Sequence, residues 1–171
     1  MQKIFAIGDI HGRLDKLLSL MDKIPIKPAC DTLVFIGDYI DRGSDGPAVV
    51  DFVLALKEQC PNLVCLCGNH EIMFLRYLDG IDEDLYVQNG GMATLRAYGI
   101  SPSDSLKKRK AKIPLRHLRF MSPLSCSTKR KIIFLSTRGF VPVCPSPSRV
   151  RRISYGSVRN SWSPTTILES V

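Results

Sequence analysis

Short apolar runs and amphipathic segments alternate along the first half of the chain. Residues 3–7, 32–36 and 63–67 are mostly apolar runs of the length that is typical of buried strands. After each run, apolar residues recur at helical spacing, in residues 14–21, 48–56 and 73–78. Three strand–loop–helix units in succession predict an α/β sheet with its functional loops at the carboxyl ends of the strands.

The second half of the chain is less regular. We expect residues 81–98 to form an acidic loop followed by a helix, and residues 106–118 to form a basic helix. Past Pro123 the composition changes to serines, prolines and basic residues with almost no acids. We therefore divide the chain into a folded region, 1–123, and an irregular, poorly ordered tail, 124–171.

The net charge of +8 is concentrated in this tail. Up to Pro123 there are 16 Lys and Arg against 15 Asp and Glu, whereas the tail has 8 against 1. The basic cluster at residues 107–112 is expected to be a solvated helix face. Nucleic-acid contact is the alternative, but no stacking aromatic residues are interleaved with these charges, which counts against it.

Length and hydropathy limit the class of protein. The chain has 171 residues, 44% of them apolar and 23% charged, which is the composition of one soluble globular domain. No apolar run approaches the ~20 residues that a membrane span needs. The N-terminal strand leads directly into Gly8 without a basic leader or a cleavage site, which predicts a cytoplasmic protein.

Each predicted strand is followed by a loop that carries metal-ligand side chains. The pairs are Asp9 and His11, then Asp38 and Asp41, then Asn69 and His70. One such pair could be no more than a capped turn. Because loops at the ends of neighbouring strands converge in space, three pairs in succession indicate one common site.

The types of side chain in these loops indicate phosphate-ester chemistry. Carboxylate, imidazole and amide groups suit Mn, Fe or Zn ions, and a carboxylate can bridge two of them. Two ions about 3.5 to 4 Å apart can activate a water and neutralise the charge on a phosphoryl group. Arg42 is placed beside this site to hold phosphoryl oxygens with its planar guanidinium.

Three motifs carry a family resemblance. Residues 8–12, 37–43 and 68–71 read Gly-Asp-Ile-His-Gly, Gly-Asp-Tyr-Ile-Asp-Arg-Gly and Gly-Asn-His-Glu. They resemble the signature motifs of the phosphoprotein phosphatase group of calcineurin-like metallophosphoesterases, in the branch of bacterial serine/threonine phosphatases and diadenosine tetraphosphatases. The resemblance covers residues 1–123. It implies the first half of a calcineurin-like β-sandwich flanked by helices, with an irregular C-terminal tail.

The resemblance also implies a role for each candidate residue. It makes Asp9 and His11 ligands of one divalent metal ion, Asp38 a bridge between two, and Asn69 a ligand of the second ion. His70 would be the general acid that protonates the leaving oxygen, with Asp41 orienting its ring. Arg42 and Asn69 would bind the phosphate. The two ions would be Mn, with Fe or Zn as alternatives.

The implied activity is hydrolysis of phosphomonoesters such as phosphoserine and phosphothreonine, by direct attack of a hydroxide held between the two metals. The motifs do not separate a phosphorylated protein from a small phosphorylated substrate. Dinucleoside polyphosphates are therefore an alternative substrate class. A catalytically inactive fragment or binding module is a further alternative.

The chain departs from the family pattern after its third motif. The family needs two more metal histidines, but the only histidine after His70 is His117, which lacks the expected context. We therefore expect impaired activity from the chain as printed. If each codon of the encoding DNA begins at the third base of the present codon, the DNA for residues 134–142 can encode Phe-Val-His-Ala-Gly-Leu-Arg-Pro. The DNA for residues 153–157 can likewise encode Leu-Leu-Trp-Ile-Arg. Both resemble the missing continuation.

These strings suggest a hypothesis about the tail. A one-base slip near Leu124 would explain the missing histidines, the basic composition and the truncation of the chain. A natural low-complexity tail that binds acidic partners is the alternative. Repeated sequencing of the encoding DNA that finds no slip near this codon would remove the frameshift hypothesis.

Overall fold

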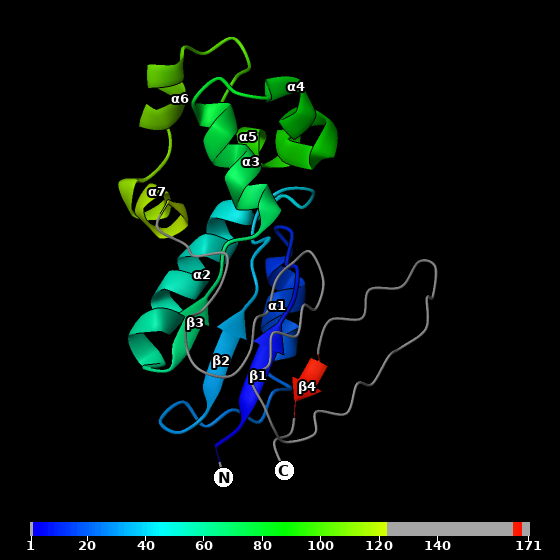
Figure 1. Cartoon of the computed structure of the whole chain (residues 1–171), viewed down its shortest axis with the longest axis vertical. Helices are drawn as coiled ribbons and strands as arrows, with labels where there is room; N and C mark the ends of the chain where they lie inside the picture. Colours follow the sequence, from blue (N-terminus) through cyan, green and yellow to red (C-terminus); the bar gives the residue numbers. More distant parts are fainter. Residues whose placement is uncertain (1, 123–165, 169–171) are drawn as a thin grey trace, which may run out of the picture.

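A four-stranded sheet lies at the base of the structure. The computed structural model describes residues 2–122 and, for the backbone alone, residues 166–168. The spatial order of the strands is β3 (Leu63–Cys65), β2 (Thr32–Phe35), β1 (Ile4–Ile7) and β4 (Thr166–Leu168) (Figure 1). Strands β1, β2 and β3 are parallel, with Ile4 opposite Thr32 and Leu33 opposite Leu63, and β4 is antiparallel to β1.

The three parallel strands confirm the α/β arrangement that the apolar runs predicted. Strand β3 ends at Cys65, two residues earlier than its apolar run suggests. The sequence did not predict β4, whose residues 166–168 pair with β1. The rest of the 124–171 region lies outside the described residues, so its predicted disorder and the frameshift hypothesis stay predictions.

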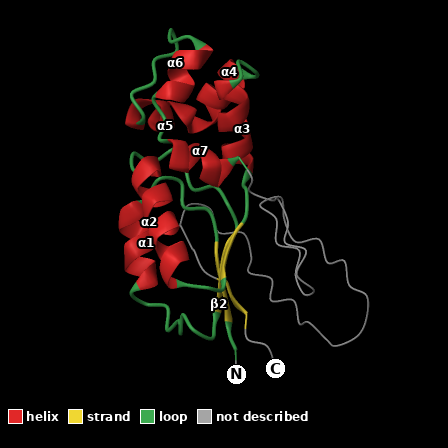
Figure 2. Ribbon diagram, turned by 90° about the vertical axis from the view of Figure 1, so that its left-hand side faces the viewer, coloured by secondary structure: helices red, strands yellow, loops and turns green. Residues whose placement is uncertain are grey.

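Side chains alternate between the two faces of the sheet, as expected for extended backbone. The main core receives Phe5, Ile7, Leu33 and Phe35. Helices α1 (Leu14–Met21) and α2 (Gly46–Gln59) cover that face (Figure 2). On the other face, Ala6 and Val34 form a smaller apolar cluster with Leu66. The parallel strands are therefore apolar on both faces, which explains their nearly continuous apolar runs.

A group of helices lies beyond the carboxyl ends of the parallel strands (Figure 1). It consists of α3 (Asn69–Leu78), α4 (Glu83–Tyr86), the wide turn η1 (Val87–Gly91), α5 (Met92–Ala97), α6 (Leu106–Ala111) and α7 (Leu115–Met121). Aromatic rings of Phe74, Tyr77, Tyr86 and Tyr98 pack together inside it. This group therefore has an aromatic core next to the loops that carry the candidate ligands.

Two predicted boundaries were wrong. The basic segment 106–118 forms two helices, because Pro114 lacks an N–H and disfavours helical backbone at the preceding residue. Residues 68–71 are not a loop throughout, since α3 already begins at Asn69. The second correction affects the site, because it places His70 in the first turn of a helix.

The basic cluster at residues 107–112 is largely paired within the fold. Lys108 and Lys112 form ion pairs with the buried Asp104. Arg109 points inward, where it pairs with Glu83 and stacks over the ring of Tyr77. Lys107, Lys108 and Lys110 are exposed, as expected for a solvated helix face, whereas the buried Arg109 departs from that expectation. In the described part of the chain, no helix is long and apolar enough to cross a membrane.

Candidate metal centre

Hydrogen bonds tie together the three loops that follow β1, β2 and β3. The carbonyl oxygen of Asp38 accepts the backbone N–H of His11 at 2.8 Å. The Glu71 carboxylate accepts the backbone N–H groups of Asp38, Tyr39 and Gly68, each at 2.9 Å. Glu71 is fully buried, and burial together with the charge of Asp38 raises its pKa to about 7, although three N–H donors oppose the shift. Asp38 therefore contacts both neighbouring loops, because its carbonyl oxygen binds the N–H of His11 and its own N–H binds Glu71.

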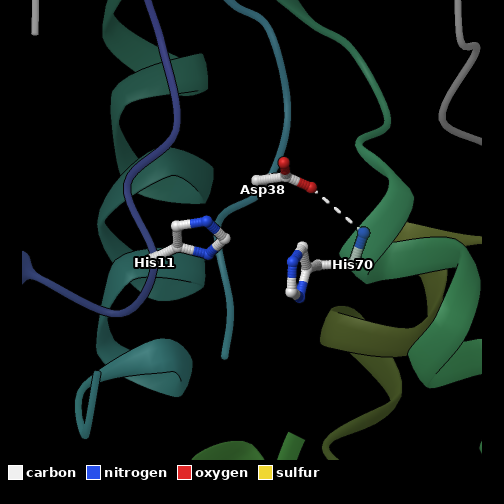
Figure 3. Close-up of side chains that lie close together, drawn as sticks. All are labelled: His11, Asp38 and His70. Atoms are coloured by element: carbon white, nitrogen blue, oxygen red, sulfur yellow. Dashed lines mark hydrogen bonds between the residues drawn. The ribbon is translucent and has the colours of Figure 1, made fainter. Parts of the chain in front are cut away.

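His11, Asp38 and His70 form a buried group of possible metal ligands. One ligand atom from each lies within 4.8 Å of the others. Figure 3 shows the two imidazole rings on either side of the Asp38 carboxylate, whose Oδ1 atom accepts the backbone N–H of His70 at 3.0 Å. The two rings meet edge to face with their centroids 4.6 Å apart. The structure thus brings one side chain from each loop to a common centre.

The tautomer of His11 is set by its surroundings. Its Nδ1 atom lies 3.1 Å from the carbonyl oxygen of Ile40, which can only accept, so Nδ1 carries the proton. Its Nε2 atom lies 4.0 Å from a carboxylate oxygen of the half-exposed Asp9. Burial lowers the pKa of His11 and keeps the ring neutral. A neutral ring with its second nitrogen held by a carbonyl is the usual state of a histidine that binds a metal.

His70 is held by Asp41. The Nδ1 atom of His70 lies 2.8 Å from Oδ2 of Asp41, and both side chains are buried. Burial lowers the pKa of His70, but the hydrogen bond and the charge of Asp41 outweigh it, so the net shift is upward. The other ring nitrogen of His70, Nε2, is not bound to Asp41 and lies 3.4 Å from Nη2 of Arg42.

The other two predicted residues flank this centre. Arg42 is exposed and accessible to a bound anion. Asn69 is half-buried and begins α3 directly before His70, so the turn that touches Asp38 also carries its amide. His117 lies outside the centre, where its ring bonds to Asp51 at 2.7 Å and to Tyr98 at 2.8 Å.

Unusual backbone angles coincide with the candidate site. Among the described residues, five that are not glycine have positive φ, and four of these are His11 (48°), Asp38 (53°), Asp41 (71°) and Arg42 (63°). Left-handed backbone is unfavourable for residues with a Cβ atom, and such strain is concentrated at functional sites. The surrounding hydrogen bonds hold these loops in shapes that the residues themselves do not prefer.

The donor set fits one divalent ion better than two. Asp9, His11 and Asp38 supply a carboxylate, a neutral imidazole and a second carboxylate, which suit Mn, Fe or Zn. For a second ion, the sequence-based candidates among the described residues are Asp38 and Asn69. The additional histidines of the family pattern do not occur among the described residues.

Sequence reasoning missed three residues of this region. Glu71 belongs to the third motif, but sequence reasoning assigned it no role. Its position in the first turn of a helix was the signal that could have identified it. Tyr86 and Thr94 contact Asp41 although 45 and 53 residues separate them from it, and no local pattern marks them. A single sequence offers no signal for contacts of this kind.

The parallel sheet carries these candidate ligands at the ends of its strands, and comparison with known families identifies the class of protein. The calcineurin-like phosphoesterase family matches residues 2–137, and the chain belongs to this family.

Individual relatives are similar over less than half of this chain. The symmetrical bis(5'-nucleosyl)-tetraphosphatase of Pseudomonas fluorescens (strain SBW25) is 34% identical over 71 residues, 42% of this chain and 24% of that protein. The serine/threonine-protein phosphatase rdgC of Drosophila melanogaster is 40% identical over 79 residues, 44% of this chain and 12% of that protein. This chain therefore spans about a quarter of the length of the tetraphosphatase it matches.

Among solved structures, that of the metallophosphoesterase from Sphaerobacter thermophilus aligns with a TM-score of 0.45 and 16% sequence identity over 74% of this chain and 42% of that one.

Proposed function

We propose that this chain hydrolyses phosphate esters with the help of divalent metal ions. The observation that carries the proposal is the position of the His70–Asp41 pair beside His11 and Asp38, two buried side chains that could hold a metal ion, with the exposed Arg42 next to His70. An acid, an anion-binding guanidinium and a metal centre within reach of one another are the groups that phosphoryl transfer to water requires.

Each residue has a definite task in this proposal. Asp9, His11, Asp38 and Asn69 hold the ions, which when bound supply an activated water and neutralise phosphoryl charge. Arg42 binds the phosphoryl oxygens with its guanidinium. As the bond from phosphorus to the leaving oxygen breaks, His70 gives that oxygen a proton from Nε2. Asp41 keeps Nδ1 protonated and stabilises the ring while it is charged.

We propose phosphomonoesters, such as phosphoserine and phosphothreonine in proteins, as the substrates. Dinucleoside polyphosphates are the second candidate, because 42% of the chain is similar to a symmetrical tetraphosphatase. Both substrates present a phosphate to the same acid and the same guanidinium, so the site residues alone do not separate them.

The rate is expected to be low. With only Asp38 and Asn69 available from the described residues, the second ion is held weakly, and turnover should need a high Mn²⁺ concentration. A chain that binds the metal without turnover would instead be a binding module of the same fold.

Hydrolysis of p-nitrophenyl phosphate in the presence of Mn²⁺ tests the proposal. The parent chain should release nitrophenolate, and on phenyl phosphate, whose leaving group needs a proton, His70→Ala should reduce kcat by about 100-fold, the range expected for loss of a general acid. The control is His117→Ala, because His117 is equally buried but contacts Asp51 outside the site. That variant should lose stability and keep turnover per folded molecule.

Two outcomes would contradict the proposal. A parent chain without turnover in Mn²⁺, Fe²⁺ or Zn²⁺ would favour the binding module. A His70→Ala variant with the parent's kcat on phenyl phosphate would remove His70 as the acid. In an active chain, release of phosphate from a phosphoserine peptide would be compared with cleavage of diadenosine tetraphosphate.

A further inference from the structure

The Asp41 carboxylate has hydrogen-bond partners on both oxygens. Its Oδ2 atom faces Nδ1 of His70 at 2.8 Å. Its Oδ1 atom accepts the hydroxyl of Tyr86 and the hydroxyl of Thr94, each at 2.6 Å. Tyr86 is the last residue of α4 and Thr94 lies in α5, so both come from the helical segment after the third motif. All four side chains are buried.

The direction of each hydrogen bond follows from the donors present. The hydroxyl of Thr94 accepts the backbone N–H of Asp41 at 2.8 Å, and its one proton therefore goes to Oδ1. Burial, together with the charge of Asp41, raises the pKa of Tyr86 well above its ordinary value, so Tyr86 also stays a donor. With two donors on Oδ1, the remaining oxygen is left to accept Nδ1–H of His70.

The same segment also supports the neighbouring arginine. The carbonyl oxygen of Gly90 accepts the backbone N–H of Arg42 at 3.1 Å. A Cβ atom on Gly90 would lie 2.9 Å from Cγ of Arg42, so only glycine permits this approach without a shift. The segment from Tyr86 to Thr94 thus holds the backbone of both Asp41 and Arg42.

From this geometry we infer that Tyr86 and Thr94 are positioning residues for the His70 acid, and that they act through Asp41. The inference rests on the proposed function, since it gives these hydroxyls a part in proton transfer. Without them, the Asp41 carboxylate could rotate and exchange its oxygens. The His70 ring would then lose its fixed tautomer and its orientation toward a leaving oxygen.

Packing alone would not require these hydroxyl groups. The ring of Tyr86 packs against Phe74 and Tyr77, and a phenylalanine would fill the same space. Tyr77 provides the matched control, because it is equally buried but its hydroxyl has no hydrogen-bond partner among the described residues. Tyr77→Phe removes a neighbouring hydroxyl without changing the surroundings of Asp41.

The kinetic test compares two esters whose leaving groups differ in their need for a proton. In the double variant Tyr86→Phe/Thr94→Val, kcat for phenyl phosphate should fall about 10-fold, because this leaving group depends on general acid. The kcat for p-nitrophenyl phosphate, whose leaving group is stable as an anion, should change much less, and KM for both esters should stay the same. Thr94→Ser should restore part of the loss, and Tyr77→Phe should have no effect.

An equal fall for both esters would overturn the inference, since it would indicate general damage to the site. Equal rates for the double variant and the parent on phenyl phosphate would overturn it as well.

A nuclear magnetic resonance measurement tests the inference without turnover. The chain has three histidines, so long-range ¹H–¹⁵N spectra of the intact chain can resolve each ring. In the parent, His70 should appear as the Nδ1–H tautomer, and the double variant should contain a mixture of tautomers with His117 unchanged. An unchanged His70 signal would contradict the inference. A shifted His70 signal in a chain without turnover would support the positioning role and count against the proposed function.

Discussion

The carboxylate of Glu71 accepts the backbone N–H of Asp38 at 2.9 Å, and so joins the loop after β2 to the first turn of α3. The same carboxylate holds the N–H groups of Tyr39 and Gly68. A fully buried side chain thus determines the position of Asp38, the central candidate ligand. This relationship makes the stability of the fold and the geometry of the site depend on one buried group.

Replacing Glu71 by glutamine should destabilise the chain at pH 5, where the raised pKa of Glu71 keeps the carboxyl group protonated and no charge is buried. Glutamine keeps the size but replaces one accepting oxygen with a donor, which faces backbone N–H groups. The free energy of unfolding should fall by about 1 kcal/mol, the contribution of one hydrogen bond. The difference should shrink as the pH rises through about 7, because ionisation of Glu71 destabilises the folded parent. Urea denaturation measures it, with the exposed Glu58→Gln as the control. Equal stability of the two variants would show that the Glu71 bonds contribute little.

Gly68→Ala should disturb both the metal site and the loop that carries Asp38. A Cβ atom on Gly68 would overlap Oδ1 and the backbone nitrogen of Asp38, so the carboxylate and its loop would have to move. Mn²⁺ affinity should fall at least about 10-fold, as it does when a group that orients a ligand is lost.

The control for Gly68→Ala is Gly46→Ala, where the nearest atoms, all of Ile40, would lie at an ordinary 3.5 Å or more. Isothermal titration would show the difference. Parent-like Mn²⁺ affinity in Gly68→Ala would mean that Asp38 is not a ligand in this position.

Asp38→Asn should separate metal binding from folding. Asparagine tolerates left-handed backbone, and its Oδ1 atom can still accept the N–H of His70. The midpoint of thermal unfolding should therefore change little, while Mn²⁺ affinity falls at least about 10-fold through the lost charge. Asp45→Asn, an exposed position on the same loop, is the control. The assignment of Asp38 fails if both variants bind Mn²⁺ equally well.

Asp104 should contribute stability that depends on pH. Lys108, Lys112 and the N–H of Ser101 hold the pKa of Asp104 well below its usual range. A lowered pKa stabilises the fold above the unfolded value of about 3.9, and this contribution is lost as the pH falls through the folded value. Asp104→Asn should thus be less stable than the parent at pH 7, and the difference should shrink below about pH 4.

Thermal melts of the parent and Asp104→Asn at pH 7, 5 and 3 would follow this difference. Asp22→Asn, at an exposed site, should show no such convergence. A constant gap between Asp104→Asn and the parent at all three pH values would contradict the role of Asp104.

The sequence predicted the elements whose pattern is local. Alternating and continuous apolar runs identified β1 and β2 within one residue, because buried strands leave few polar positions. The break between α6 and α7 was missed, although Pro114 was visible, because the basic character continues across it. Convergence of the ligand loops was predictable for a topological reason, since parallel strands end at one edge of the sheet.

Contacts between distant segments were not predictable in the same way. The positions of Tyr86 and Thr94 depend on how α4 and α5 turn back over the loop after β2, which no spacing in the sequence encodes. The pairing of His117 with Asp51 likewise needs α7 to lie against α2. Strand β4 pairs with β1 from more than 150 residues away, which lies beyond any local pattern.

The left-handed backbone at His11, Asp38, Asp41 and Arg42 places selection for stability in conflict with selection for function. Glycine would relax each of these positions, since it adopts positive φ without steric cost. Each such exchange would also delete a candidate ligand, acid partner or anion-binding group. At the buried His11, Asp38 and Asp41, glycine would also leave buried hydrogen-bond partners unpaired, whereas the exposed Arg42 has no such restraint. A search for heat-resistant variants that scored melting temperature alone would therefore favour loss of Arg42, and with it the group that we propose to bind phosphate.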